Sequence, residues 1–246
     1  MLAQWILLLF IVTLISSKGI PERIAGGKTV SIASVPWQAA LHSSGEYICG
    51  AVIYSEKIIL TAAHCVFDVW PSDLTIRVGS SNSNDGGQLV KSSQILVHEG
   101  YDDDDNDYAH DIAVIELETN LQMGDNVRSI PLADTAPLPG SSASVSGWGD
   151  TESGEEPDHL RETTVKILDQ KECINALSIK FWKDHLCAGS PGKDACDGDS
   201  GGPLVSDGKL VGIVSFGGMC SDPEPRGVYA NVAELKPWIL KTIQGL

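Results

Sequence analysis

Cationic residues are scarce in this sequence. It contains 17 Lys and Arg residues against 33 Asp and Glu residues, and its formal net charge at pH 7 is −16. Nucleic acids and anionic membrane surfaces attract proteins mainly through clustered Lys and Arg side chains. The charge balance therefore disfavours both as partners. The sequence also contains no Asn-x-Ser/Thr motif, so N-glycosylation is not expected.

Long apolar runs are also lacking, with one exception near the start. Residues 5–15 are apolar apart from Thr13, and the small residues Ser16 and Ser17 follow. This run is shorter than the roughly 20 residues that cross a bilayer. It predicts a signal peptide over residues 1–17, a secreted, extracellular protein, and no membrane association after signal removal. Because the basic residue that usually precedes such a run is missing, an uncleaved membrane anchor is the alternative.

No Cys-x-x-Cys pair occurs among the six cysteines, which disfavours a structural zinc site. Cysteines of an exported chain are more often oxidised in pairs. The sequence therefore predicts disulfides, although spacing alone leaves about 15 pairings open for six cysteines.

Helical periodicity is nearly absent. Runs rich in β-branched and aromatic residues predict strands at 37–42, 48–55 and 58–61, and clusters of turn residues lie at 79–87 and 137–140. Only the C-terminal end looks helical, with Pro237 in the first turn and apolar residues that repeat near 3.6: Leu235, Trp238, Ile239, Ile243 and Leu246. The chain is therefore predicted to be all-β with one short C-terminal helix.

Three residues that could form a nucleophilic triad occur in one particular order. A serine hydroxyl needs an imidazole to take its proton and a carboxylate to orient that imidazole. Ser200, His64 and Asp111 supply these groups. No histidine follows Ser200, which excludes the order found in α/β-hydrolases, and no aspartate precedes His64, which excludes the subtilisin order. Only the order His, Asp, Ser remains.

The segments around these residues resemble the trypsin/chymotrypsin family of serine proteases. The resemblance covers essentially the whole chain after Arg23 and rests on four motifs in the family's order: Arg23-Ile24-Ala25-Gly26-Gly27, Thr61-Ala62-Ala63-His64-Cys65, His110-Asp111-Ile112-Ala113-Val114 and Gly198-Asp199-Ser200-Gly201-Gly202-Pro203. It implies a protease domain over residues 24–246. That domain would contain two six-stranded antiparallel β-barrels packed together, with the active-site cleft between them. His64 and Asp111 would come from the first barrel and Ser200 from the second.

The same resemblance assigns further roles. It implies an oxyanion hole formed by the backbone N–H groups of Gly198 and Ser200. It also implies an activation propeptide over residues 18–23, with cleavage after Arg23 and pairing of the new Ile24 α-amine with Asp199. The disulfides that it implies are Cys49–Cys65, Cys173–Cys187 and Cys196–Cys220.

Substrate specificity is implied by the residue at the family's pocket floor, which is Asp194 here. A carboxylate at this position favours a substrate Arg or Lys. Gly217 and Gly227 match positions that admit a long side chain, and Ser215 begins the segment that pairs with the substrate backbone. Ala195 stands where many trypsins have Ser. Since that hydroxyl helps to solvate a lysine ammonium, we expect Arg to be preferred over Lys.

Several alternatives and absences accompany this interpretation. Arg226 replaces the family's common Pro beside Gly227 and could alter the pocket, so a chymotrypsin-like or elastase-like protease is one alternative. A non-catalytic binding protein of the same family is another. No cofactor or metal is expected, because the loop corresponding to the calcium loop of vertebrate trypsins, residues 79–98, is short and has Ser80 in place of its first carboxylate. The expected partners are protein or peptide substrates and protein inhibitors, and the chain is expected to be monomeric.

Overall fold

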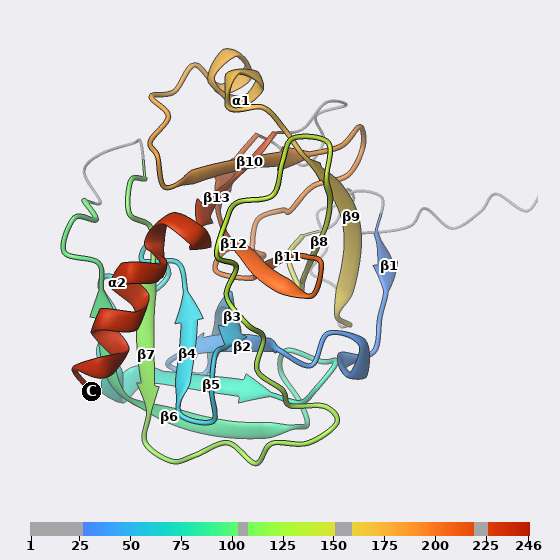
Figure 1. The fold of residues 1–246 in the computed structure, drawn as a ribbon. Helices are drawn as coiled ribbons and strands as arrows, with labels where there is room; N and C mark the ends of the chain where they lie inside the picture. The colour runs from blue at the N-terminus through green and yellow to red at the C-terminus, as the bar shows by residue number, and fades with distance from the viewer. Residues whose placement is uncertain (1–26, 103–107, 151–158, 219–225) are drawn as a thin grey trace, which may run out of the picture.

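Six antiparallel strands in the first half of the chain close into a barrel in the order β2-β3-β4-β7-β6-β5. The computed structural model describes residues 27–102, 108–150, 159–218 and 226–246, and Figure 1 shows this first barrel below the second. Its strands are β2 (Gln38–Ser43), β3 (Glu46–Ile53), β4 (Ile58–Thr61), β5 (Leu74–Val78), β6 (Gln88–Val97) and β7 (Ala113–Leu117).

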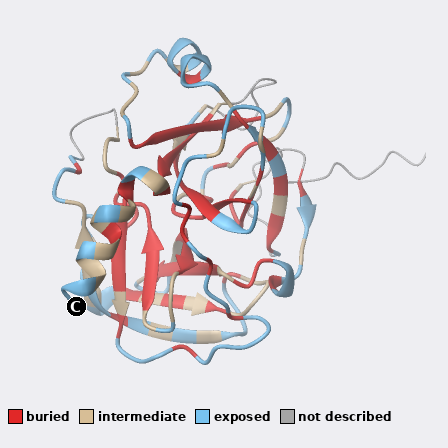
Figure 2. Cartoon of the chain, viewed as in Figure 1, coloured by how far each residue is buried: buried red, intermediate tan, exposed pale blue. Residues whose placement is uncertain are grey.

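Apolar side chains directed inward explain why this barrel closes. Burial alternates along β5, where Leu74, Ile76 and Val78 are buried and the residues between them are partly exposed. This is the period of two that places successive side chains on opposite faces of a sheet. The fully buried side chains of Leu41, Ile59 and Ile115 belong to the same core. Figure 2 shows that β4 and β7 are buried throughout most of their length.

The second barrel is formed by β8 (Ser142–Gly147), β9 (Arg161–Ile167), β10 (His185–Gly189), β13 (Gly227–Asn231), β12 (Lys209–Gly217) and β11 (Pro203–Ser206). These strands pair in that order, and β11 pairs back onto β8. The short strand β1 (Lys28–Thr29) adds to β9. The predicted pair of six-stranded antiparallel barrels is therefore confirmed.

Buried hydrogen bonds join the two barrels. The Ser146 hydroxyl on β8 donates to Gln38 Oε1 on β2 at 2.7 Å. The backbone N–H of Gly50 on β3 donates to the Ser200 carbonyl at 2.8 Å. Gly50 also lies so close to the Gly202 backbone that a Cβ at Gly50 would come within 3.0 Å of the Gly202 Cα. The glycine at position 50 thus allows close approach of the two halves of the molecule.

The helices differ from the prediction. An unpredicted helix, α1 (Gln170–Leu177), begins at Asp169, whose side chain accepts a hydrogen bond from the Lys171 N–H. Such a cap satisfies a backbone donor that would otherwise be unpaired, and it stabilises a short helix. Two 3-10 turns, η1 (Ile32–Ser34) and η2 (Pro71–Asp73), complete the described elements.

The C-terminal helix is confirmed, but the predicted place of Pro237 within it is wrong. Helix α2 (Val232–Gln244) begins earlier than expected because the Asn231 side chain caps it by accepting from the Ala233 N–H. Pro237 therefore lies in the second turn. Figure 1 shows α2 packed beside β7. No helix in the described residues is both long and apolar enough to cross a membrane.

Candidate active site

The ends of two paired strands bring His64 and Asp111 together. Strands β4 and β7 are antiparallel neighbours, with Thr61 paired to Ala113. His64 follows the end of β4 by three residues, and Asp111 precedes the start of β7 by two. The two side chains therefore lie at the same end of the first barrel. The disulfide Cys49–Cys65 ties the residue after His64 to β3.

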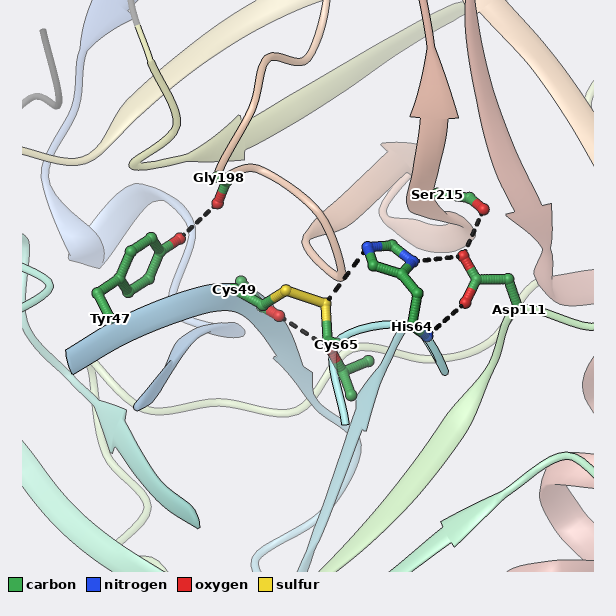
Figure 3. The surroundings of a disulfide bond; sticks show 9 residues. Tyr47, Cys49, His64, Cys65, Asp111, Gly198 and Ser215 are labelled. Carbon is green, nitrogen blue, oxygen red and sulfur yellow. Dashed lines mark hydrogen bonds and ion pairs between the residues drawn. A yellow bond between two sulfur atoms is a disulfide. The ribbon is translucent and has the colours of Figure 1, made fainter. Parts of the chain in front are cut away.

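Asp111 is the hydrogen-bond acceptor at the centre of this site. Its side chain is 1% exposed. Oδ2 lies 2.8 Å from His64 Nδ1 and accepts from the Ser215 hydroxyl at 2.5 Å, while Oδ1 accepts from the His64 backbone N–H at 2.9 Å. Figure 3 shows these bonds converging on the carboxylate.

This arrangement fixes the orientation of the imidazole. Since the carboxylate can only accept, Nδ1 of His64 carries a proton, and Nε2 is the nitrogen that can accept another. Nε2 lies 3.7 Å from Cys65 Sγ, and sulfur is a weak hydrogen-bonding partner. The first barrel thus holds a hydrogen-bonded His64–Asp111 pair with a defined orientation of the imidazole.

Ser200 lies in the loop between β10 and β11, on the second barrel. Its carbonyl accepts from Gly50 on β3, and the Gly201 N–H donates to the Val214 carbonyl at 2.8 Å. Gly201 has φ +76°, and a Cβ there would overlap the Gly50 carbonyl and the Thr61 hydroxyl. The glycine after Ser200 therefore allows the loop to approach the strands that support His64. These contacts connect Ser200 to the site through its backbone.

Asp199 is a buried carboxylate directly before Ser200. It is 1% exposed, and it accepts hydrogen bonds from the backbone N–H groups of Gly149 at 2.8 Å and Cys196 at 2.9 Å. The pKa of Asp199 is raised to about 6, mainly because burial removes the hydration of the charged form and to a smaller extent because the carboxylates of Asp150 and Asp197 lie nearby. A positive group beside Asp199 would stabilise its charged form.

Asp194 is a second buried carboxylate on the same segment. It is 2% exposed, and its Oδ1 accepts from the Ala195 N–H at 2.8 Å and from the Tyr229 hydroxyl at 3.3 Å. Burial raises the pKa of Asp194 to about 7, and Arg226 lowers it by its charge. A Cβ at Gly227 would come within 2.7 Å of Asp194 Oδ1. Only glycine at position 227 therefore leaves room around this carboxylate.

Gly217 lies opposite Gly227, where β12 pairs with β13. A Cβ at Gly217 would come within 2.9 Å of the Arg226 carbonyl and 3.1 Å of the Gly227 Cα. Ser215 also lies on β12, so the predicted pocket residues come from neighbouring strands of the second barrel.

Two of the predicted disulfides, Cys49–Cys65 and Cys173–Cys187, are confirmed. Cys196 is also disulfide-bonded, and its predicted partner Cys220 lies outside the described residues. The predicted activation residues Arg23 and Ile24 lie outside them as well. Within the described ranges, the only group of three or more His, Cys, Asp and Glu side chains close enough to share a metal ion is Cys49, His64 and Cys65, and a disulfide already occupies both sulfurs.

Sequence reasoning missed two side-chain contacts in this site. Ser215 was assigned to substrate pairing through its backbone, whereas its hydroxyl also binds Asp111. Tyr229 was not singled out, although it is fully buried and its hydroxyl binds Asp194. Burial of Tyr229 and the nearby Asp194 charge raise the tyrosine pKa well above its usual value, so the phenol stays protonated and donates. The signal in the sequence was the position of Tyr229, a polar aromatic residue two positions after Gly227.

Comparison with known proteins agrees with this geometry. The family model described as Trypsin matches residues 24–239. Trypsin beta from Drosophila erecta is 45% identical over 223 residues, which cover 89% of this chain and 87% of that protein. Trypsin alpha from Drosophila melanogaster is 43% identical over 229 residues, which cover 91% and 89% respectively.

A solved structure shares the fold as well. Neuropsin, a serine protease expressed in the limbic system of mouse brain, superposes with a TM-score of 0.82 at 38% identity, covering 88% of this chain and 98% of that one. The fold and these similarities define a serine endopeptidase built on two β-barrels. The chain belongs to the trypsin family.

Proposed function

We propose that this chain is the zymogen of a secreted, monomeric endopeptidase that cleaves peptide bonds after Arg, and less efficiently after Lys. In this proposal His64, Asp111 and Ser200 are the catalytic residues, Asp194 recognises the substrate cation, and cleavage after Arg23 activates the enzyme. Its partners are protein or peptide substrates and protein inhibitors. The buried Asp194 carboxylate is the observation that carries the substrate assignment.

The catalytic roles follow from the hydrogen bonds of His64. Asp111 holds Nδ1 protonated, so Nε2 can take the proton of the Ser200 hydroxyl as the oxygen attacks the substrate carbonyl. The imidazolium that forms is stabilised by the buried carboxylate, and it then returns the proton to the leaving amine. Water repeats the sequence to release the acyl group from Ser200. This is the standard mechanism of the family.

The oxyanion hole of the proposal consists of the Gly198 and Ser200 N–H groups, which stabilise the negative charge that develops on the substrate oxygen. Their arrangement depends on the loop that contains Asp199. The ammonium of Ile24, released by cleavage after Arg23, is the proposed counter-ion for Asp199. The need for one is evident from burial, since the charged groups Asp150 and Asp197 both repel that carboxylate.

The specificity of the proposal depends on Asp194. A guanidinium entering the pocket would pair with this carboxylate through two donors, whereas an ammonium is a compact charge that needs further oxygen partners. Position 195 carries only the methyl group of Ala195, which packs against the hydrophobic core of the second barrel. We therefore infer a preference for Arg over Lys.

Peptides that differ only in the residue before the scissile bond test this proposal. For protein cut after Arg23, we expect kcat/KM to be about tenfold higher for Arg than for Lys. Phe and Ala peptides should react about 10³-fold more slowly than Arg, because they leave the buried Asp194 charge unpaired.

Uncut protein is the control in this assay, and it should be nearly inactive. A Phe or Ala preference would overturn the pocket assignment and support the chymotrypsin-like or elastase-like alternative. An Arg-to-Lys ratio near one would contradict only the role given to Ala195. No cleavage by protein verified as cut would favour the non-catalytic alternative.

The pH dependence of cation binding tests Asp194 directly. Because its pKa is raised to about 7, the carboxyl is charged above that pH and increasingly neutral below it. The Kd of benzamidine, a small aromatic cation, should therefore be constant above pH 8. The Kd should rise about tenfold for each pH unit below 7, because each such decrease in pH leaves about a tenth as much ionised Asp194. Calorimetric titration between pH 5 and pH 9 measures this.

The His64→Ala variant tests whether His64 contributes to this pH dependence. It should retain the same rise in Kd if Asp194 is responsible. A Kd that stays flat from pH 5 to pH 8, or a dependence that disappears with His64, would contradict the assignment.

A further inference from the structure

Tyr47 links the first barrel to the loop that precedes Ser200. It lies on β3, and its hydroxyl donates to the Gly198 carbonyl at 2.7 Å. The two residues are 151 positions apart in the sequence. Figure 3 shows the phenol pointing from β3 to this carbonyl, on the side of the Cys49–Cys65 disulfide away from His64. The contact therefore anchors the loop of the second barrel to a strand of the first.

Gly198 is a residue whose orientation needs such an anchor. Its φ is +89°, a conformation that glycine adopts at no steric cost. A Cβ there would come within 3.1 Å of the Gly149 Cα, so the loop packs tightly at this point. The direction of the Gly198 N–H depends on the peptide groups on either side of this flexible residue.

Both of those peptide groups are held by hydrogen bonds. The peptide that contains the Gly198 N–H has the Asp197 carbonyl at its other end, and that carbonyl accepts from the Asp150 N–H at 2.7 Å. The next peptide contains the Gly198 carbonyl, which Tyr47 holds. Of these two donors, Tyr47 is the one supplied by a side chain.

The Tyr47 ring is itself held in place. It makes edge-to-face contacts with His42 and Trp148, with ring centroids 5.9 and 6.2 Å away. The Trp148 Nε1–H donates to the Ser81 carbonyl at 3.0 Å, and His42 Nε2 lies 3.3 Å from Asn84 Oδ1. The phenol hydroxyl is thus presented by a packed aromatic cluster rather than by a mobile side chain.

We propose that Tyr47 is a positioning residue for the oxyanion hole. By holding the Gly198 carbonyl, its hydroxyl fixes the rotation of the peptides around Gly198 and keeps the Gly198 N–H directed at the substrate oxygen. Preorganised donors of this kind stabilise a transition state because they need no reorientation during the reaction. The inference rests on the proposed function, since it requires Gly198 to serve as an oxyanion donor.

The Tyr47→Phe variant tests this role in the enzyme cut after Arg23. It removes the hydroxyl and keeps the ring. We expect kcat for an Arg peptide to fall about tenfold, the effect of losing one ordinary hydrogen bond, while KM stays within twofold. The affinity for a peptide aldehyde ending in Arg, which forms a tetrahedral adduct with Ser200, should fall by the same factor. The Kd of benzamidine, which has no oxygen atom for the oxyanion hole to bind, should be unchanged.

Two control variants separate positioning from general stability. Tyr54→Phe removes the hydroxyl of a partly buried tyrosine just beyond the end of β3 and should leave every constant unchanged. Trp148→Phe loses the hydrogen bond to Ser81 and loosens the packing of Tyr47, but keeps the Tyr47 hydroxyl. Trp148→Phe should lower the Tm, while its kcat should fall by less than that of Tyr47→Phe.

Each outcome decides the question. If Tyr47→Phe leaves kcat and aldehyde affinity unchanged, Tyr47 does not position the hole. If benzamidine and aldehyde weaken together, or the variant fails to fold, its role is structural and the inference is overturned. If the wild-type enzyme cleaves no Arg peptide, the proposed function has failed instead.

Discussion

Replacing Ser200 by Ala in the cut enzyme is expected to lower kcat for an Arg peptide about 10⁶-fold, a loss of the size seen when another triad hydrolase loses its nucleophile. The change removes the proposed nucleophile, the Ser200 hydroxyl, while the loop should keep its conformation. Its anchors, the Ser200 carbonyl with Gly50 and the Gly201 N–H with Val214, involve backbone atoms only. Steady-state kinetics at protein concentrations determined by absorbance measures the loss.

Two comparisons make this result specific. The Kd of benzamidine should be unchanged in Ser200→Ala, because the substitution leaves Asp194 and its hydrogen bond from Tyr229 in place. Adding His64→Ala to Ser200→Ala should cause almost no further loss, because residues that act as one unit are strongly non-additive. Residual activity above about 1%, with contamination by wild type excluded, would refute the assignment of Ser200 as nucleophile.

The Asp111→Asn variant is expected to lose about 10⁴-fold in kcat, the value known for this change in the family's standard example of triad catalysis. The present geometry explains why the loss should be large. Asp111 accepts from three donors, namely the His64 N–H, His64 Nδ1 and the Ser215 hydroxyl. An amide offers only one acceptor oxygen, and its NH₂ group favours an unprotonated Nδ1. The imidazole would then carry its proton on Nε2, the nitrogen that must accept one.

Asp184 supplies a matched control for Asp111. It is also buried, and its Oδ2 lies 2.6 Å from the His110 backbone N–H and 3.0 Å from His110 Nδ1. Asp184→Asn therefore makes the same chemical change beside a histidine that the mechanism does not use, and kcat should change less than threefold. Equal losses in the two variants would show that Asp111 matters for folding rather than for catalysis.

The candidate catalytic residues could be named from the sequence because each of them lies in a short motif. The order of His64, Asp111 and Ser200 excluded two other classes of hydrolase, and the structure places His64 beside Asp111 as expected. Two barrels and two disulfides were likewise predicted correctly from the family resemblance. Alternation of apolar residues alone indicated strands but not how they close.

The misses have a common physical cause. Helix α1 has only 8 residues, too few for a helical period to stand out in the sequence, and its Asp169 cap and the Cys173–Cys187 disulfide stabilise it. The contacts of Tyr47 with Gly198 and of Tyr229 with Asp194 join residues far apart in the sequence. No periodicity or spacing encodes such contacts, since they exist only after the strands have paired.

The hydrogen bonds that cross between the barrels have a consequence for the molecule as a whole. Ser215 reaches Asp111, Gly50 holds Ser200, and Tyr47 holds Gly198, so each barrel carries an incomplete set of working parts. In this respect the two barrels of one polypeptide depend on each other as the two subunits of a heterodimer do. Peptide hydrolysis therefore depends on the interface between the two barrels. A shift of one barrel against the other that is large enough to break one of these hydrogen bonds should lower its rate.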